Sequence, residues 1–338
     1  MMRAAENRVG IVVIGRNEGE RLKGCLRSVI GAGPVVYVDS GSTDGSQDFA
    51  RSFGVALVEL PVPPKFTAAR ARNAGIAALL EHAPGLEMIQ MVDGDCIVEP
   101  RWIETGVMAL DADPGLAGVF GRRAEIAPDR SIYNRICDIE WNVPPGPVLA
   151  TGGDALFRVA ALTQVGGYAD DLIAGEEPDM CVRMARAGGW RFLRVDEPMT
   201  RHDAAITRFG QWWKRARRAG YAAAEHVGRH GAGALPGDVA QVRRMMLWGF
   251  WLPALALLSL LLALLDWRLG AIAVLLGGLY LLQFLRLSRR ERPFWPSARL
   301  AFGAGALRVI HQFAAFSGLA GRWLDRVGKR DRKIMEYR

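Results

Sequence analysis

The sequence predicts an α/β protein with a mostly parallel sheet, followed by a helical hairpin long enough to cross a membrane. Three observations support this prediction. Short apolar runs alternate with helical segments in the N-terminal part, acidic residues stand at the ends of several of these runs, and two long uncharged runs come later, at residues 247–265 and 269–285. Strands that alternate with helices are typical of a parallel sheet covered on both faces.

The expected elements of the α/β part follow from hydrophobic periodicity. Buried strands are expected at residues 9–14, 35–38, 55–59, 88–92, 117–123 and 190–195. Helices are expected at residues 18–30, 68–80, 101–110 and 175–189, and a further helix capped by Ser42 or Thr43 should end at Phe53. The proline-rich segment at residues 60–66 should be a loop, and the glycines near residue 152 should form an apolar turn.

The charge distribution of the chain indicates which kinds of molecule it could bind. The net charge is +8, with basic residues gathered at 214–218 and 286–299 beside apolar segments, and no nucleic-acid-binding motif is apparent. This pattern favours an anionic membrane surface and predicts no nucleic-acid partner. The four cysteines contain no C-x-x-C pair, which fits reduced thiols in the cytosol and argues against a structural zinc site.

Two carboxylates, Asp93 and Asp95, follow the apolar run at 88–92 and are separated only by Gly94. In an open α/β sheet, ligands bind at the carboxyl ends of the strands. Two carboxylates at that edge can hold Mg²⁺ or Mn²⁺, and the glycine leaves room for a diphosphate. On its own the motif favours an ordinary solvated turn over a metal site.

Four motifs in a fixed order remove much of this ambiguity. They are VVIGRNEGERL at 12–22, VDSGSTDGS at 38–46, DGDC at 93–96 and GEEPD at 175–179. In this order and spacing the chain resembles the family 2 glycosyltransferases, over about residues 9–195. The resemblance implies a GT-A fold, which is Rossmann-like and binds nucleotide sugars, and it implies sugar transfer.

The resemblance assigns a nucleotide-binding role to the first two motifs. It implies that Asp39 accepts a hydrogen bond from uracil, and that Gly15, Arg16 and Glu18 line the nucleotide cleft. Arg72, in AARARNAG, is placed to reach phosphate as a bidentate donor. The alternatives are a turn-forming aspartate at Asp39 and a solvated arginine at Arg72.

The resemblance also assigns the metal ligands. Asp95 is expected to bind the cation directly, with Asp93 facing the diphosphate. His202, in TRHD, is either a third metal ligand or diphosphate contact, as in some relatives, or an ordinary satisfied histidine.

The acidic segment GEEPD supplies a candidate general base, because an attacking hydroxyl must lose its proton. The family usually carries Glu-Asp where this chain has Glu176 and Glu177, and the second residue is generally the base. This points to Glu177 but leaves Glu176 open. A helix N-terminus stabilises the anion, so the base is expected to be ionised at neutral pH. Gly153 and Asp154, in GGDALFR, match a segment near the donor sugar, although a tight turn also explains the glycines.

The C-terminal part is expected to associate with a membrane. We expect a catalytic domain at 1–205, an interfacial basic and aromatic helix and linker at 206–244, two transmembrane helices at 245–287, and a basic loop with an amphipathic helix at 288–338. A third span at 300–323, or a soluble core built from the two long runs, is the alternative. The basic segment after the second run places the catalytic domain on the cytoplasmic side of the plasma (inner) membrane.

Together these features predict an inverting, metal-dependent glycosyltransferase. It would move a sugar from a nucleoside diphosphate, expected to be UDP, to a hydroxyl of a lipid-linked or saccharide acceptor, in surface polysaccharide or glycolipid assembly. The processive relatives' Gln-x-x-Arg-Trp motif is not matched by QWWKR at 211–215, which favours non-processive transfer. The alternatives are a nucleotidyltransferase and a non-catalytic membrane subunit that binds nucleotide sugars.

Overall fold

A computed structural model describes residues 8–61 and 66–328. Part of the expected loop at 60–66 and both chain ends therefore lie outside the described residues. The chain divides into two compact units. We call Met1–Ala127 with Glu140–Ala204 the sheet unit, and Pro128–Ile139 with Ala205–Arg338 the helical unit.

The sheet unit begins with four parallel strands. β1 (Val9–Gly15) lies between β2 (Val35–Asp39) and β4 (Met88–Asp93), and β3 (Ala56–Glu59) pairs with β2. The β-branched residues of β1 are wholly buried, as expected for a central strand covered on both faces. Gly15 pairs with Asp39 and Ile14 with Asp93, so the motifs at the ends of β1, β2 and β4 lie at one edge.

The rest of the sheet is mixed. β8 (Ala155–Arg158) runs antiparallel to β4, β6 (Leu116–Glu125) antiparallel to β8, and β9 (Arg191–His202) parallel to β6. The short strands β5 (Cys96–Val98) and β7 (Gly146–Val148) pair antiparallel with β9. Because β6 and β9 run in the direction of β4, their carboxyl ends reach the same edge of the sheet.

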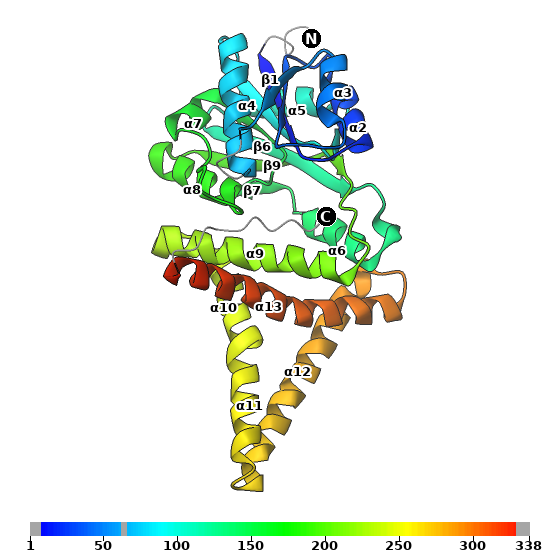
Figure 1. Ribbon diagram of the computed structural model, residues 1–338, viewed down its shortest axis with the longest axis vertical. Helices are drawn as coiled ribbons and strands as arrows, with labels where there is room; N and C mark the ends of the chain where they lie inside the picture. The colour runs from blue at the N-terminus through cyan, green and yellow to red at the C-terminus, as the bar shows by residue number, and fades with distance from the viewer. Residues whose placement is uncertain (1–7, 62–65, 329–338) are drawn as a thin grey trace. The chain divides into compact units, whose positions relative to one another are not determined.

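Helices cover both faces of this sheet. α2 (Glu20–Val29) and α3 (Ser46–Ser52) lie on one face, and α4 (Ala68–His82) lies on the other (Figure 1). Right-handed crossovers place α2 and α3 on one face and α4 on the other. The chain moves outward from β1 through β2 to β3, and it then returns past β1 to β4. The remaining helices of the unit are α5 (Trp102–Ala112), α7 (Val159–Gln164) and α8 (Glu176–Gly188). The predicted α/β class is confirmed.

Three local expectations differ from the structure. α3 starts at Ser46, because the Ser42 hydroxyl donates to Asp39 and the Thr43 hydroxyl donates to Asn17 instead of capping a helix. Strand β8 begins directly after Asp154, where no strand was expected. β9 extends to His202, so this residue ends the strand and does not follow it.

The helical unit is built on two long helices that lie side by side, α9 (Phe209–His230) and α13 (Ala298–Val327) (Figure 1). Their backbones approach at Gly220 and Gly318, where a methyl group would clash with the backbone of the other helix. Buried ion pairs add to this packing. Glu225 of α9 binds Arg322 of α13 at 2.8 Å, and Glu291 binds Arg308 of α13 at 2.8 Å. The rest of the unit includes most of α6 (Ile132–Trp141) and α10 (Pro236–Met246).

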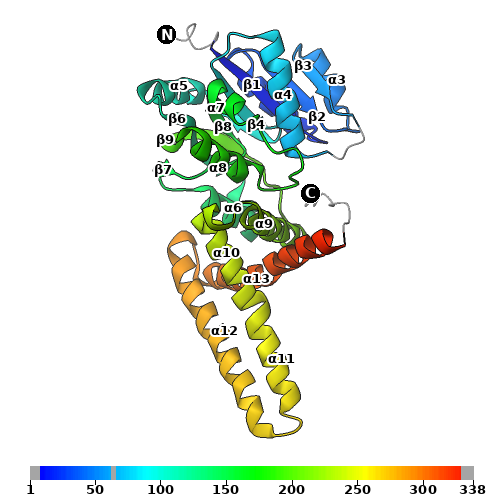
Figure 2. The same cartoon turned by 90° about the vertical axis from the view of Figure 1, so that its left-hand side faces the viewer.

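A helical hairpin, α11 (Leu252–Leu262) and α12 (Gly270–Glu291), extends from this pair (Figure 2). Two helical stretches, Pro236–Leu262 and Trp267–Phe294, are long and apolar enough to cross a membrane. Their leucines are largely uncovered, with Leu257 60% and Leu275 70% exposed, which does not fit helices buried in a soluble core. α13 is not such a span, and its small residues pack on α9.

Candidate active site

The turn after β4 brings Asp93 and Asp95 to the edge of the sheet. The Gly94 amide donates to the Ile14 carbonyl oxygen at 2.7 Å, which pins this turn against the end of β1. A Cβ at Gly94 would lie only 3.0 Å from the same oxygen. The glycine therefore allows the close approach of the turn to β1.

A buried arginine joins this turn to the acidic helix. The Arg72 side chain, only 3% exposed, donates to Asp93 Oδ1 at 3.0 Å and to Glu176 Oε1 at 2.7 Å. Glu177 Oε1 lies 3.1 Å from the same guanidinium. Arg72 thus points inward from α4, not toward solvent, and its phosphate-binding role is not visible in this arrangement.

The pKa values of two carboxylates in this cluster, Asp93 and Glu177, shift in opposite directions. Burial alone would raise the pKa of Asp93, but the guanidiniums of Arg72 and Arg123 lower it below its usual value. Burial and the neighbouring Glu176 raise the pKa of Glu177 to about 7, although Arg72 opposes them. Glu177 is therefore not held fully ionised at neutral pH, as was expected from its place at a helix N-terminus, because burial and Glu176 raise its pKa.

Glu176 and Glu177 differ in access. α8 begins after Gly175, whose left-handed backbone (φ 82°) turns the chain into the helix. The Glu176 side chain is 5% exposed and Glu177 is 15% exposed. Glu177 is thus the more accessible carboxylate, and its raised pKa suits proton transfer near neutral pH.

Gly153 completes the wall of this cluster. A Cβ at this position would lie 2.7 Å from Arg72 Nη2, 3.0 Å from Asp93 Oδ2 and 3.3 Å from Glu177 Oε1. At the preceding Gly152, a Cβ would meet nothing within 4 Å. Only the second glycine is therefore required by packing.

Asp154, predicted to contact the sugar, is 1% exposed and supports the turn. It accepts from the Asp93 amide at 2.9 Å and from the Thr200 hydroxyl at 2.9 Å. These contacts join β4, β8 and β9, which gives Asp154 a positioning role in this structure.

Arg123 and Trp141 were missed by the sequence analysis. Arg123 donates to Asp93 Oδ2 at 3.2 Å and lies over the Trp141 ring at 5.0 Å, and Trp141 packs edge-on against His202 at 4.6 Å between ring centroids. A signal for Arg123 was present, because it stands at the carboxyl end of an apolar strand, as Asp93 does. No local pattern marks Trp141.

The predicted nucleotide end lies where β1 and β2 end. Asp39 is fully buried, and its carboxylate accepts from Tyr37, Gly41, Ser42 and Gln47. It therefore holds the 40–42 turn. A bond to a nucleotide base requires one of these donors to move aside.

The other residues predicted for this end lie close by. Gly15 stands where a Cβ would meet the Tyr37 ring and hydroxyl at 3.2 Å. Glu18 pairs with Arg21 at 2.8 Å, and the exposed Arg16 lies over the Phe66 ring at 5.4 Å. Arg16 and the Phe66 ring thus offer a cation and an aromatic face beside the strand ends.

The donors predicted for a metal are also brought together. His202 Nε2 lies 3.1 Å from Asp95 Oδ2, and both side chains are buried. This separation fits two adjacent ligands of an octahedral ion with bonds of about 2.1 Å. The Asp93 carboxylate is instead bound by Arg72 and Arg123, so it is not in direct contact with the Asp95–His202 pair. Burial raises the pKa of the neighbouring Cys96 thiol well above its usual value, so it is a poor ligand for hard cations.

Two family profiles match adjoining parts of the chain. One, described as glycosyl transferase family 2, matches residues 10–150, and the other, glycosyl transferase family group 2, matches residues 137–285. The chain belongs to glycosyltransferase family 2. The enzyme is therefore a sugar transferase, and the nucleotidyltransferase and non-catalytic alternatives are not supported.

Relatives of this glycosyltransferase are diverse. The pre-mycofactocin glycosyltransferase of Mycobacterium tuberculosis is 26% identical over 350 residues, covering 94% of this chain and 72% of that protein. Glycosyltransferase AglE of Haloferax volcanii is 31% identical over 111 residues, which are 30% of this chain and 35% of AglE. A mannosyltransferase from Pyrobaculum calidifontis, solved with GDP-Man and Mn²⁺, covers 94% of this chain and 88% of its own, with 18% identity and a TM-score of 0.56. This likeness confirms the predicted GT-A fold.

We predict that Gly153→Ala lowers the turnover of this glycosyltransferase at least tenfold, because the added methyl group displaces Arg72 or Asp93. Gly152→Ala is the matched control and should keep near-normal turnover. Sugar transfer is measured together with the melting temperature of each variant. Equal turnover in the two variants would show that the packing around Gly153 does not matter for transfer.

Proposed function

We propose that this glycosyltransferase is inverting and metal-dependent, and that it transfers one sugar from a nucleoside diphosphate to an acceptor hydroxyl at a membrane surface. The observation that carries the proposal is the position of Glu177. Its carboxylate lies against Arg72, and Arg72 binds the strand-end Asp93. A candidate base thus stands next to the carboxylates that face the leaving group.

Glu177 is the proposed general base. It accepts the proton of the acceptor hydroxyl while that oxygen attacks the anomeric carbon. The bond from the anomeric carbon to the diphosphate breaks, and its electron pair leaves with the nucleoside diphosphate. The other buried carboxylates are engaged, with Glu176 and Asp93 on Arg72 and Asp154 on Thr200, so a second displacement has no obvious nucleophile. A single displacement inverts the anomeric centre.

Asp95 and His202 are the proposed metal ligands, with Asp93 beside them. A bound Mg²⁺ or Mn²⁺ would neutralise the charge that develops on the departing diphosphate. Arg123 and Asp154 hold Asp93 in place from the other side. The similar mannosyltransferase was solved with GDP-Man and Mn²⁺, which supports a nucleoside diphosphate donor.

The nucleotide is proposed to lie over the ends of β1 and β2, near Gly15, Arg16, Glu18 and Asp39. UDP was the donor expected from the resemblance, whereas GDP is the nucleotide of the similar mannosyltransferase. Both classes therefore belong in the donor screen. Asp39 contributes by holding the turn at residues 40–42, and Ser42 or Gln47 gives way if Asp39 binds the base directly.

The helical unit is proposed to attach the enzyme to the plasma membrane, with a lipid-linked acceptor. α12 has 22 residues and is about 33 Å long at 1.5 Å per residue, close to the thickness of a bilayer core. Exposed tryptophans stand near both ends of the hairpin, Trp251 and Trp267, and exposed arginines end α12 at Arg289 and Arg290. The domain limits at residues 205, 244 and 287 remain part of this proposal.

We expect Glu177→Gln to reduce the rate constant of transfer by about 10²–10⁴-fold, the usual contribution of a general base. The exposed Glu104→Gln, on α5, is the control and should behave as wild type. The assay presents UDP- and GDP-sugars with membrane lipid extract and Mn²⁺, and identifies the released nucleotide and the anomeric configuration of the product. Near-normal turnover of Glu177→Gln would refute the base assignment, and release of inorganic diphosphate would refute sugar transfer from a nucleoside diphosphate.

The pH dependence of kcat/KM should show an acidic limb. Because Glu177 accepts a proton only when ionised, kcat/KM should fall about tenfold per pH unit below about pH 7 and level off above it. Arg72 lowers the pKa of Glu177, so Arg72→Gln should move the limb to higher pH. A flat profile in wild type, or an unmoved limb in the variant, would contradict the role of Glu177.

The membrane arrangement predicts opposite sides for two reporters. A reporter inserted at the hairpin tip, Trp267–Leu269, should lie outside the cytoplasm, whereas one fused after residue 338 should lie inside. Alkaline carbonate should leave the protein in the membrane fraction. A cytoplasmic tip reporter, or release by carbonate, would exclude the proposed hairpin.

A further inference from the structure

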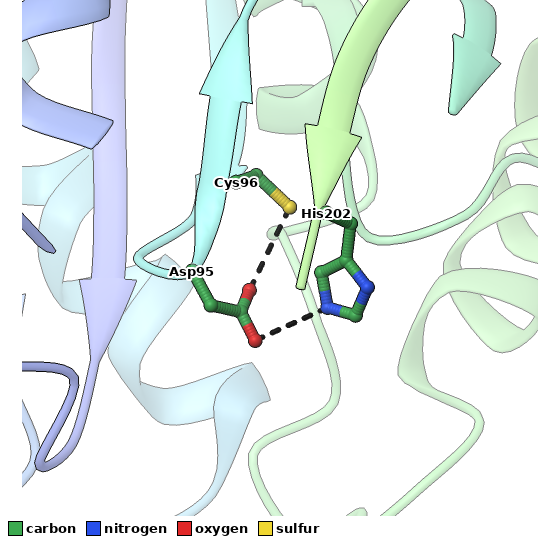
Figure 3. A group of neighbouring side chains, drawn as sticks. All are labelled: Asp95, Cys96 and His202. Atoms are coloured by element: carbon green, nitrogen blue, oxygen red, sulfur yellow. Dashed lines mark hydrogen bonds and ion pairs between the residues drawn. The ribbon is translucent and has the colours of Figure 1, made fainter. Parts of the chain in front are cut away.

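The cysteine that follows the metal-binding aspartate shares its site. Cys96 Sγ lies 3.6 Å from Asp95 Oδ1, and His202 Nε2 lies 3.1 Å from Asp95 Oδ2. The sulfur, a carboxylate oxygen and an imidazole nitrogen all lie within 4.8 Å of one another. Figure 3 shows the three side chains facing one another, from the β4–β5 turn, the start of β5 and the end of β9. Each side chain is buried.

These distances suit a tetrahedral ion. With zinc bonds of about 2.3 Å to sulfur and about 2.0 Å to oxygen and nitrogen, tetrahedral angles separate sulfur from oxygen by about 3.5 Å and oxygen from nitrogen by about 3.3 Å. The observed 3.6 Å joins the sulfur to Asp95 Oδ1 and the observed 3.1 Å joins the imidazole to Asp95 Oδ2, so each value is matched through a different oxygen of the same carboxylate, which must turn to present one oxygen to both neighbours. Apart from this rotation, little rearrangement is needed to seat an ion among the three atoms.

The donor set favours one class of ion. Thiolate and imidazole favour Zn²⁺ and Co²⁺, whereas Mg²⁺ prefers oxygen ligands alone. Arg123 places Nη2 3.4 Å from Cys96 Sγ, so a cation already faces the sulfur. A metal that binds the sulfur releases the thiol proton to solvent.

We propose that Asp95, Cys96 and His202 form a three-ligand site for a borderline divalent cation such as Zn²⁺ or Co²⁺, with the Cys96 sulfur as the third ligand. This proposal depends on the proposed function in one respect: Asp95 and His202 are the ligands in both. Because those two residues are shared, Zn²⁺ excludes Mg²⁺ or Mn²⁺ and inhibits transfer. The absence of a C-x-x-C pair therefore does not exclude zinc here. The single cysteine is joined by the neighbouring Asp95 and by His202 from another strand.

Titration of the reduced, full-length protein in detergent with Co²⁺ tests the proposal. A sulfur-to-cobalt charge-transfer band in the near ultraviolet should appear in wild type and be lost in Cys96→Ser. Cys137→Ser removes a buried cysteine from another element, α6, and should keep the band. Zn²⁺ affinity, from competition with Co²⁺, should fall about a hundredfold in Cys96→Ser, since loss of outer partners alone costs about 10–100-fold.

The outcomes distinguish this proposal from the proposed function. Absence of the band in wild type, or its persistence in Cys96→Ser, would overturn the sulfur ligand, whatever the enzyme's activity. Mn²⁺ binding measured by electron paramagnetic resonance should be unchanged in Cys96→Ser, which also shows that the variant is folded. If that variant does not fold, His202→Gln serves instead, and an unaltered cobalt spectrum in it would equally reject the site.

Discussion

The ion pairs of Arg72 are the interaction on which the rest of the site depends. A guanidinium that is 3% exposed is stable only when carboxylates satisfy it, and removal of one partner of such a pair costs about 3–5 kcal/mol. Its partners come from the end of β4 and the start of α8. Arg72 therefore fixes the distance between Asp93 and Glu177, the two carboxylates proposed to face the leaving group and the acceptor.

A second set of contacts supports the first from the opposite side. Asp154 binds the Asp93 backbone and Thr200, and Arg123 binds the Asp93 carboxylate while stacking on Trp141. Trp141 in turn packs on His202. Asp93 is thus held on two sides, and the histidine at the end of β9 is tied to the same network. The groups proposed for catalysis lie on strands and at a helix start, which hold them more rigidly than loops do.

The sequence predicted those parts of the fold and of the site that depend on a short local pattern of residues. Parallel strands, the Asp93–Asp95 turn and the acidic start of α8 follow from apolar runs and the carboxylates beside them. The direction of Arg72 did not follow, because it depends on where α8 packs. Asp39 and Asp154 were assigned to ligands, but both carboxylates bind other parts of the protein. Asp39 accepts from Gly41, Ser42 and Gln47, and Asp154 accepts from Thr200. These partners are known only once the chain is folded. Ser42 was taken for a helix cap for the same reason.

The cluster around Asp93 also constrains the order of events at this site. Carboxylates outnumber guanidiniums there, since Asp93, Asp154, Glu176 and Glu177 lie against Arg72 and Arg123, and Asp95 lies against His202. A region with excess negative charge repels a free diphosphate and attracts its complex with a cation. Under the proposed function, a nucleoside diphosphate donor would therefore enter most readily as its complex with a cation, and its affinity should depend on how much of it carries a cation in solution.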